Sequence, residues 1–349
     1  MKHSYERCTR CILSAAFPRI EFDENGVCNF CRETILYTNE TDSIEKARKQ
    51  IENLLKKNKG NSEYDAVMCY SGGKDSTYTL MLAVKKYGLR VLSFTFDNGY
   101  ISPTAFENIR RVTNYLGIDQ FTFTPSKKNM NAIIKASALN PIYNARTLTR
   151  ISAVCNSCIS IVNMTALKIA IEKKLPFVLA GFTLGQIPLN GIVFKNNYEF
   201  LKESREAPLK RLREKAGEFV DSYLTLPDSL ISEIDSYPHT INLLCLEKLT
   251  EEEIISSISE IGWIAPGDVD GCSSNCMLNS FSNMIHCRAL GYNPYELELS
   301  HLIRKGLMTR EEALAKISDQ PVKQQQAVMK ELGITENELD TLNGIYGKK

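Results

Sequence analysis

A short run of glycine, hydroxyl and charged residues is the part of this sequence best suited to chemistry. Residues 71–77 read Ser-Gly-Gly-Lys-Asp-Ser-Thr and lie between a predicted strand and a predicted helix. Adjacent glycines let the backbone approach a ligand closely, and the N-terminus of the following helix attracts phosphate. Lys74 supplies a positive charge and Asp75 a carboxylate able to bind Mg²⁺. The other members of this predicted phosphate site are Ser71, Gly72, Gly73, Ser76 and Thr77.

The loop differs from two familiar phosphate-binding motifs. A Walker A loop requires Gly-x-x-x-x-Gly-Lys-Ser/Thr. Met68 stands at the first glycine position of that pattern, and Asp75 follows Lys74 where a hydroxyl residue is needed. The dinucleotide pattern Gly-x-Gly-x-x-Gly is absent from the loop as well.

Hydrophobic periodicity places the loop in an alternating series of strands and helices. Predicted strands cover residues 64–70, 90–96, 120–124, 177–180 and 240–245. Predicted helices cover residues 43–58, 76–87, 103–116, 159–174, 251–262 and 297–307. Three capping boxes mark further helix starts at Thr250/Glu253, Thr309/Glu312 and Thr335/Glu338. The alternation predicts an α/β fold with a doubly wound parallel sheet.

Three loops that follow predicted strands are expected to face one crevice. They cover residues 71–76, 97–99 and 181–185. In doubly wound sheets the ligand binds at the carboxyl ends of the strands. We therefore expect Gly181 to lie beside the nucleotide.

The sequence of residues 71–76, placed after a strand, resembles the loop of the PP-loop ATP pyrophosphatases, also called adenine nucleotide alpha hydrolases. The resemblance covers residues 63–265. It implies that the loop binds the pyrophosphate end of ATP with Mg²⁺, and that the α-phosphate is transferred to a substrate oxygen. A nitrogen or sulfur nucleophile would then displace AMP, with Lys74 and Asp75 in catalytic roles. The resemblance also implies adenine contacts at Phe94, Thr95 and Phe96.

Two cysteine pairs near the N-terminus have the spacing of a metal site. Cys8/Cys11 and Cys28/Cys31 form two Cys-x-x-Cys units separated by sixteen residues, within the range of zinc ribbons. Four thiolates leave no open ligand position, so the sequence predicts a structural zinc site. Unligated thiols and a rubredoxin-like iron are the alternatives.

Both ends of the chain resemble the N-acetyl sugar amidotransferases. The similarity rests on the cysteine-containing residues 8–31 and on residues 299–313, Leu-Ser-His-Leu-Ile-Arg-x-Gly-x-Met-Thr-Arg-Glu-Glu-Ala. Enzymes of that family act in surface-polysaccharide assembly and convert an acetamido to an acetamidino group. Residue 2 is Lys2, so an N-terminal cysteine nucleophile is absent and ammonia would come from a partner glutaminase.

Further cysteines lie within and after the predicted α/β region. Cys155 and Cys158 precede a predicted helix, and Cys272 and Cys276 follow the helix predicted at 251–262. Their placement resembles that of tRNA thiolases, in which three cysteines bind a [4Fe–4S] cluster with one open iron. The resemblance implies Cys155 and Cys158 as ligands with catalytic roles, and Cys272 as third ligand, with Cys276 as the alternative. A redox Cys-x-x-Cys pair, a second zinc and unligated thiols also remain open.

Length and composition indicate a globular chain of several parts. The 349 residues are 43% hydrophobic, with a net charge of +1 and eleven cysteines. Without a run of roughly 18 apolar residues or a secretory signal, we expect a cytoplasmic protein that does not use the membrane. We expect a zinc ribbon at 1–40, a linker helix at 41–62, a PP-loop domain at 63–265 and a mainly helical region at 266–349. The cationic stretch 202–215 indicates either a solvated helix face or a phosphate-facing surface.

Three functions follow from these patterns. The first is ATP-dependent sulfur transfer to an adenylated carbonyl oxygen through a cluster. The second is an amidotransferase that uses ATP, Mg²⁺ and a structural Zn²⁺ together with a glutaminase. The third is a nucleotide-sensing or zinc-scaffold protein without enzymatic activity. The expected substrate is a small molecule or RNA, the expected partner a sulfur donor or a glutaminase, and the expected assembly a homodimer.

Overall fold

The computed structural model describes residues 5–33, 40–232, 234–319 and 321–346. A six-stranded sheet lies at its centre, in the order β3-β2-β1-β4-β6-β5. The first five of these strands run parallel, and β5 pairs antiparallel with β6 at one edge. The strands are β1 (Ala66–Cys69), β2 (Val91–Phe96), β3 (Gln120–Phe123), β4 (Phe177–Leu179), β5 (Val193–Lys195) and β6 (His239–Ile241).

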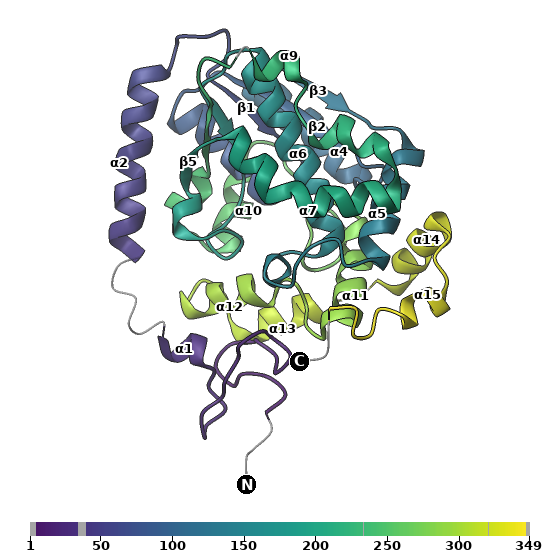
Figure 1. The fold of residues 1–349 in the computed structure, drawn as a ribbon. Coiled ribbons are helices and arrows are strands. Elements are labelled where there is room, and N and C mark those ends of the chain that lie inside the picture. The colour runs from purple at the N-terminus through teal and green to yellow at the C-terminus, as the bar shows by residue number, and fades with distance from the viewer. Residues whose placement is uncertain (1–4, 34–39, 233, 320, 347–349) are drawn as a thin grey trace.

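Helices cover the sheet and extend beyond it (Figure 1). The N-terminal and central ones are α1 (Asn29–Glu33), α2 (Glu40–Asn58), α3 (Lys74–Met81), α4 (Pro103–Leu116), α5 (Lys127–Leu139), α6 (Ala153–Glu172), α7 (Tyr198–Ala216), α8 (Asp221–Leu224), α9 (Asp228–Ile231) and α10 (Glu251–Ser259). The C-terminal ones are α11 (Leu278–Leu290), α12 (Glu296–Arg304), α13 (Arg310–Ser318), α14 (Val322–Leu332) and α15 (Glu336–Asp340). The predicted α/β class is therefore confirmed.

Local signals account for many of these boundaries. All three predicted capping boxes are present, with reciprocal bonds at Thr250, Thr309 and Thr335. Helix α4 has Ser102 as its N-cap, proline in its first turn and Gly117 in the left-handed conformation at its end. These local rules explain why the predicted and observed bounds of α4 agree.

Two expectations about the elements are wrong, and one edge strand was not predicted. Helix α6 begins at Ala153 instead of residue 159, because Ser152 accepts a hydrogen bond from the Cys155 N–H and caps it. Cys155 and Cys158 therefore lie inside the helix and not before it. Strand β6 ends at Ile241, and the apolar residues 243–246 form a 3₁₀ turn. The sheet is not wholly parallel, because residues 193–195 add an antiparallel edge strand.

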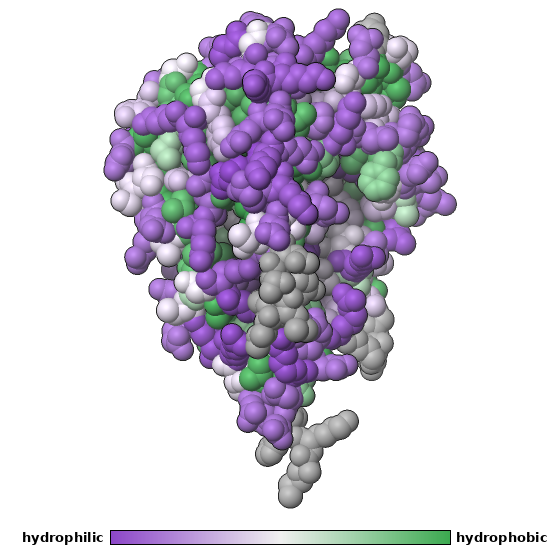
Figure 2. Space-filling model, turned by 90° about the vertical axis from the view of Figure 1, so that its left-hand side faces the viewer, coloured by the Kyte–Doolittle hydropathy of each residue, from purple (hydrophilic) through white to green (hydrophobic). Residues whose placement is uncertain are grey.

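The C-terminal helices share the hydrophobic core of the α/β unit. Phe281 of α11 and Met329 of α14 belong to the same buried cluster as Ile133 of α5 and Ile161 of α6. Helix α2, expected as a linker, packs Ile51 and its buried neighbours into the core on the other side of the sheet. Its outer side belongs to a mainly hydrophilic face of the molecule (Figure 2).

The N-terminal cysteine segment lies against α12 and α13 (Figure 1). Arg310 donates hydrogen bonds to the carbonyl groups of Cys11, at 3.0 Å, and Cys8, at 3.3 Å. The buried carboxylate of Glu296 accepts a hydrogen bond from the Ser14 N–H and pairs with Arg7 at 2.9 Å. The two ends of the chain thus form one packed unit.

Helix α6 is the one described helix long and apolar enough to meet the length and composition of a membrane span. Its position is that of a core helix, since it packs against β1, β4 and α5. Its buried Ile161 belongs to the same hydrophobic cluster as Val67 of β1, Val178 of β4 and Ile133 of α5. Its buried Leu167 belongs to a second cluster, with Tyr198 of α7.

Candidate functional site

The glycine loop lies at the point where the order of the sheet reverses. Strand β1 has β2 on one side and β4 on the other, and the chain visits these sides in turn. Such a reversal opens a crevice at the carboxyl ends of the strands, where doubly wound proteins bind ligands. Residues 71–77 leave β1 there, and Gly181 follows β4 at the same edge. A Cβ atom on Gly181 would lie 3.0 Å from the Cα of Ser76, so the two segments are in close contact.

Glycine at position 72 is required by the backbone. Gly72 has a φ of +74°, and a Cβ atom there would lie 2.3 Å from the carbonyl oxygen of Ala105. Its own carbonyl oxygen accepts a hydrogen bond from the Trp263 indole at 2.8 Å. The turn is therefore fixed by surrounding elements before any ligand binds.

The hydroxyl groups of the loop do not all face the same way. The Ser71 and Ser76 hydroxyls lie 3.1 Å apart, and both residues line the main cavity of the molecule. The buried Thr77 hydroxyl donates to the Gly73 carbonyl at 2.8 Å and lies 3.0 Å from the Tyr70 hydroxyl. Ser71 and Ser76 thus face the cavity, although the Ser76 hydroxyl also donates to the Gly73 carbonyl at 3.0 Å, and Thr77 supports the turn.

Lys74 and Asp75 form a charged pair at the start of α3. The Lys74 ammonium lies 2.9 Å from the Asp75 carboxylate and 4.0 Å from that of Glu251. Burial alone would lower the pKa of Lys74, but these two carboxylates hold it above its usual range. The pair brings the cation and the carboxylate that phosphate and Mg²⁺ require into one place.

A cavity of about 1050 Å³ lies over this loop. Its wall includes the loop, the carboxyl end of β2, one face of α6, part of α7 and the segment that leads into α11. Of the three residues expected to contact adenine, Phe96 lines the cavity. The aromatic ring of Phe94 stacks on Phe121 within the sheet, and the Thr95 hydroxyl donates to the Tyr70 carbonyl. Both side chains are fully buried, and the expected adenine contacts at Phe94 and Thr95 stay a prediction.

A segment from the C-terminal region covers the loop. The Ser274 hydroxyl accepts a hydrogen bond from the Lys74 N–H at 3.0 Å. This segment is held by strand-like pairing of Ile101 with Cys276, and by the bond from the Ser102 N–H to the Asn275 carbonyl. A residue two hundred positions away therefore shares the N-terminus of α3 with any incoming phosphate.

Three of the inner cysteines converge on the same cavity. The Asn98 amide donates to the sulfur of Cys158 at 3.9 Å and to that of Cys276 at 3.7 Å. Cys155, three residues before Cys158 on α6, lies 3.3 Å from the Ser282 hydroxyl of α11. All three cysteines line the cavity together with the phosphate loop.

Cys272 lies elsewhere on the cavity wall. Its thiol donates to the Lys316 carbonyl at 3.5 Å, and its electrostatic neighbours are Asp270 and Lys316. This position favours Cys276, the alternative third ligand, over Cys272 as the partner of Cys155 and Cys158, and the identity of the third ligand stays a prediction. Burial is the main cause that raises the pKa of each of these thiols, to about 12 for Cys276. As free thiols they are neutral and poor nucleophiles at neutral pH.

The three thiols fit a metal-bound group better than a nucleophilic pair. Thiolates are soft ligands, and three of them leave one position open. Among the described residues, the four N-terminal cysteines are the one group of histidine, cysteine or acidic ligands whose ligand atoms all lie within 4.8 Å of one another.

Glu298 is a candidate site residue that the sequence analysis missed. It comes from α12, accepts a hydrogen bond from the Thr183 hydroxyl at 2.9 Å, and lines the cavity. Burial, followed by the charge of Asp75, raises its pKa to about 7. Glu298 packs closely against Gly185, since a Cβ atom on that glycine would lie 2.7 Å from the Glu298 Cα. Only long-range packing brings this carboxylate to the phosphate loop, so no local sequence signal identified it.

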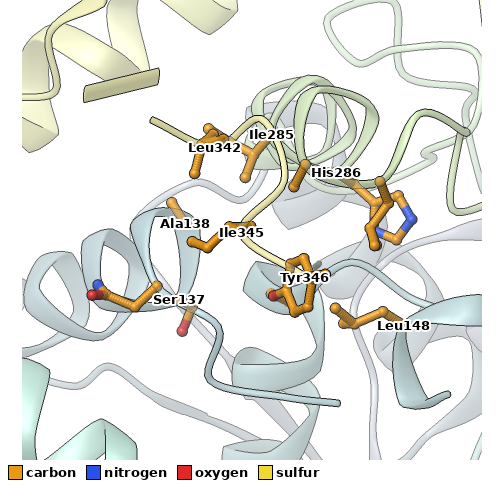
Figure 3. A pocket seen from close by; sticks show the side chains of 12 residues that line it. Ser137, Ala138, Leu148, Ile285, His286, Leu342, Ile345 and Tyr346 are labelled. Atoms are coloured by element: carbon orange, nitrogen blue, oxygen red, sulfur yellow. The ribbon is translucent and has the colours of Figure 1, made fainter. Parts of the chain in front are cut away.

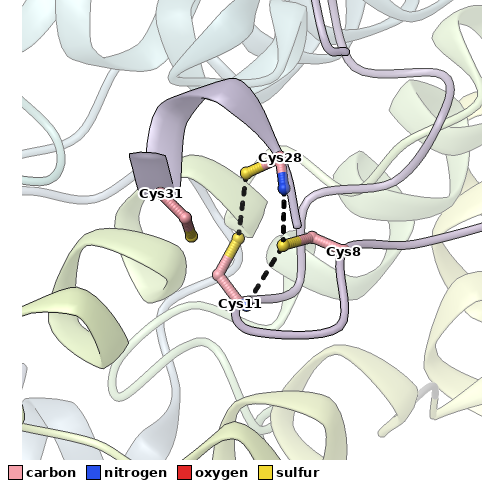
Figure 4. A group of neighbouring side chains, drawn as sticks. All are labelled: Cys8, Cys11, Cys28 and Cys31. Carbon is pink, nitrogen blue, oxygen red and sulfur yellow. Dashed lines mark hydrogen bonds between the residues drawn. The ribbon is translucent and has the colours of Figure 1, made fainter. Parts of the chain in front are cut away.

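The four N-terminal cysteines form the predicted closed site (Figure 4). All are buried, and their sulfur atoms lie within 4.8 Å of one another. The Cys11 and Cys28 sulfurs are 3.7 Å apart. A tetrahedral zinc with Zn–S bonds of about 2.3 Å places its sulfurs about 3.8 Å apart, so the set fits a zinc ion. The site lies on the opposite side of α12 and α13 from strand β1 (Figure 1).

A second, much smaller cavity lies beside Leu342, Ile345 and Tyr346 (Figure 3). Its volume of about 10 Å³ has room for about one water molecule, and apolar side chains such as Leu148 and Ile285 line it. Burial lowers the pKa of its His286 to about 3, so this imidazole is neutral. His286 therefore lines this small cavity and not the cavity above the phosphate loop.

Comparisons with known proteins agree with these features in part. Residues 275–345 match a family model described as the C-terminal domain of WbpG-like LPS biosynthesis proteins. An uncharacterized protein of Methanocaldococcus jannaschii, MJ1599, is 21% identical over 310 residues, which cover 88% of this chain and 91% of that protein. The matched domain carries Cys276 and Glu298, two of the residues on the cavity wall.

Similar solved structures include a tRNA thiolase and an NMN synthetase. The U34-tRNA thiolase NcsA of Methanococcus maripaludis, solved with its [4Fe-4S] cluster, is 16% identical, with 87% of each chain covered and a TM-score of 0.34. NMN synthetase of Francisella tularensis is 13% identical, with 85% of this chain and 97% of that chain covered, also at a TM-score of 0.34.

Proposed function

We propose that this protein is an ATP-dependent enzyme that adenylates a carbonyl-type oxygen of its substrate and releases pyrophosphate. The observation that carries the proposal is the shared cavity, whose wall contains both the phosphate loop and three half-buried thiols. The N-terminus of α3, with Ser71 and Ser76, would bind the two outer phosphates. Asp75 would bind the Mg²⁺ that bridges them, with Glu298 nearby as a second carboxylate.

The first step follows from this arrangement. The substrate oxygen attacks the α-phosphorus, the bond from that phosphorus to the bridging oxygen breaks, and pyrophosphate leaves with the Mg²⁺. Lys74 and the helix dipole stabilise the negative charge that develops on the leaving group. The former carbonyl oxygen is now part of an AMP ester, which leaves readily from carbon.

In the second step we infer a sulfur nucleophile. A sulfide attacks the activated carbon, and AMP departs with the original oxygen, so the substrate exchanges C=O for C=S. Cys155, Cys158 and Cys276 would hold a [4Fe–4S] cluster, which would supply an open iron site for sulfide delivered by a sulfur donor. Asn98, whose amide contacts two of these sulfurs, would orient them toward the loop.

A second candidate uses nitrogen in the same step. The match of residues 275–345 to a WbpG-like LPS biosynthesis domain favours an N-acetyl sugar amidotransferase. Ammonia from a partner glutaminase would attack the adenylated acetamido carbon and leave an acetamidino group. The three inner thiols would then have a structural role, with or without a metal.

Analysis of metal and sulfide in the anaerobically purified full chain separates the two candidates. Sulfur transfer predicts one zinc and about four irons and four acid-labile sulfides per chain, with broad visible absorbance. Colourless protein with zinc alone would reject sulfur transfer and leave the nitrogen reaction. In either case, incubation with Mg²⁺–ATP should give AMP and pyrophosphate through slow attack by water, and ADP with phosphate would reject adenylation itself.

A further inference from the structure

One arginine on the wall of the main cavity lacks the partner that its burial requires. Arg205 of α7 lines this cavity, is half-buried, and has an Nη1 atom shielded from solvent without a hydrogen-bond partner. Among the described residues, its guanidinium forms neither an ion pair nor a hydrogen bond. Burial lowers its pKa, and the nearby Tyr143 and Tyr198 only partly oppose this effect.

The other cations of the cavity wall all have partners. Lys74 pairs with Asp75, and Lys316 pairs with Glu251 at 2.9 Å. Arg150 donates to the Gly185 carbonyl at 2.9 Å. Since arginine remains charged in proteins, the unpaired guanidinium of Arg205 costs free energy unless a ligand supplies negative charge.

The size of the cavity leaves room for such a ligand beside ATP. Its volume of about 1050 Å³ is at the upper end of the roughly 300–1000 Å³ typical of small-molecule sites. The phosphate loop accounts for one part of its wall. Arg205 belongs to another part, formed by α7 and by the face of α6 that runs from Cys155 through Val162 to Ala166.

We propose that Arg205 binds an anionic group, a carboxylate or a phosphate, of the substrate that the enzyme adenylates. This inference rests on the proposed function and names a substrate class, an acidic small molecule whose reactive oxygen reaches the phosphate loop. The planar guanidinium offers paired N–H donors that match both anions. Among the cations of the 202–215 stretch, Arg205 thus has a role distinct from that of exposed residues such as Lys210.

The test is calorimetric titration of the full chain with two probes, inorganic phosphate and D-glucuronate. Saturating Mg²⁺–α,β-methylene-ATP fills the phosphate loop first, so that the probes report on the rest of the cavity. We expect saturable binding of one equivalent of at least one probe. Arg205→Gln should weaken it roughly tenfold to a hundredfold, since a charge-assisted bond is lost, and Arg205→Lys should weaken it less. Phosphate binding alone would identify a phosphorylated substrate, and glucuronate binding alone a carboxylate.

The matched control is Lys210→Gln, which removes the same charge from an exposed position of α7 and should leave probe binding unchanged. Absence of saturable binding, or equal binding by wild type and Arg205→Gln, would overturn the proposal. Weakened binding of the ATP analogue in Arg205→Gln, with probe binding intact, would overturn it too, by assigning the arginine to ATP. Failure of the wild-type chain to bind the analogue at all would instead reject the proposed function.

Discussion

The Ser274 hydroxyl accepts a hydrogen bond from the Lys74 N–H at 3.0 Å, at the N-terminus of the helix that follows the phosphate loop. This bond satisfies a donor that helix geometry leaves free. Phosphate binding at the same donor has to displace the hydroxyl. The segment between Cys272 and Cys276 would thus compete with ATP for the Lys74 N–H group, through the hydroxyl oxygen of Ser274.

Replacement of this hydroxyl should therefore strengthen nucleotide binding. We expect Ser274→Ala to lower the dissociation constant of Mg²⁺–α,β-methylene-ATP about twofold to tenfold, the equivalent of one ordinary hydrogen bond. Calorimetry on the full chain measures this, with Ser256→Ala on the exposed side of α10 as control. Weaker binding in Ser274→Ala would show that the hydroxyl assists phosphate binding instead.

The N-terminal metal site should stabilise both ends of the chain. Cys28→Ser removes one of four buried ligands, and we expect loss of bound zinc and a decrease of at least about 3 kcal/mol in the free energy of unfolding. Because Arg310 of α13 binds the carbonyl groups of Cys8 and Cys11, the C-terminal helices should lose protection from amide hydrogen exchange as well. Cys287→Ser, on α11, should keep its zinc. Unchanged zinc content in Cys28→Ser would contradict the four-cysteine assignment.

Cys272 and Cys276 are four positions apart, and we expect opposite results when each is replaced by serine. Cys276→Ser should abolish iron and sulfide binding, because its sulfur shares the Asn98 amide with Cys158. Cys272→Ser should retain both, because its thiol faces Lys316. Iron and sulfide analysis of the anaerobic variants gives the answer. Cluster loss in Cys272→Ser with retention in Cys276→Ser would reverse the assignment.

Glu298 should make the stability of the protein depend on pH. Its pKa of about 7 in the folded chain exceeds the ordinary value of 4.5, so the folded state holds this proton more tightly than the unfolded state. As pH rises from about 4.5 through about 7, wild type should lose stability relative to Glu298→Gln. Urea unfolding at several pH values measures the difference, with the exposed Glu252→Gln as control. A difference that does not change with pH would argue against a carboxyl with a raised pKa.

The sequence alone predicted those features that depend on neighbouring residues. The glycine loop, the three capping boxes and the spacing of the N-terminal cysteines are local patterns, and the structure contains each of them. The start of α6 was missed because its first turn contains polar residues around Cys155, although Ser152 was available as a cap. Local signals thus located the loop but not every helix boundary.

Long-range packing decided the rest of the site. Cys276 lies beside Cys158 only because residues 275–277 pair with residues 100–102. Glu298 lies near Asp75 because α12 packs against the loop after β4. Arg205 was one cation among several in a basic stretch, and only its burial on the cavity wall distinguishes it. No hydrophobic periodicity or residue spacing in a single sequence indicates any of these three positions.

The fate of ATP in the presence and absence of the Asp75 carboxylate is the most direct test of the proposed enzyme. Phosphorus NMR of the full chain with Mg²⁺ and ATP should show AMP and pyrophosphate as the only products. Asp75→Asn should reduce their formation by about a hundredfold or more, because the metal-bound leaving group loses its ligand. The exposed Glu252→Gln should keep the wild-type rate. Pyrophosphate release at the wild-type rate in Asp75→Asn, or ADP as the product, would contradict a phosphate loop that leaves the α-phosphate open to attack.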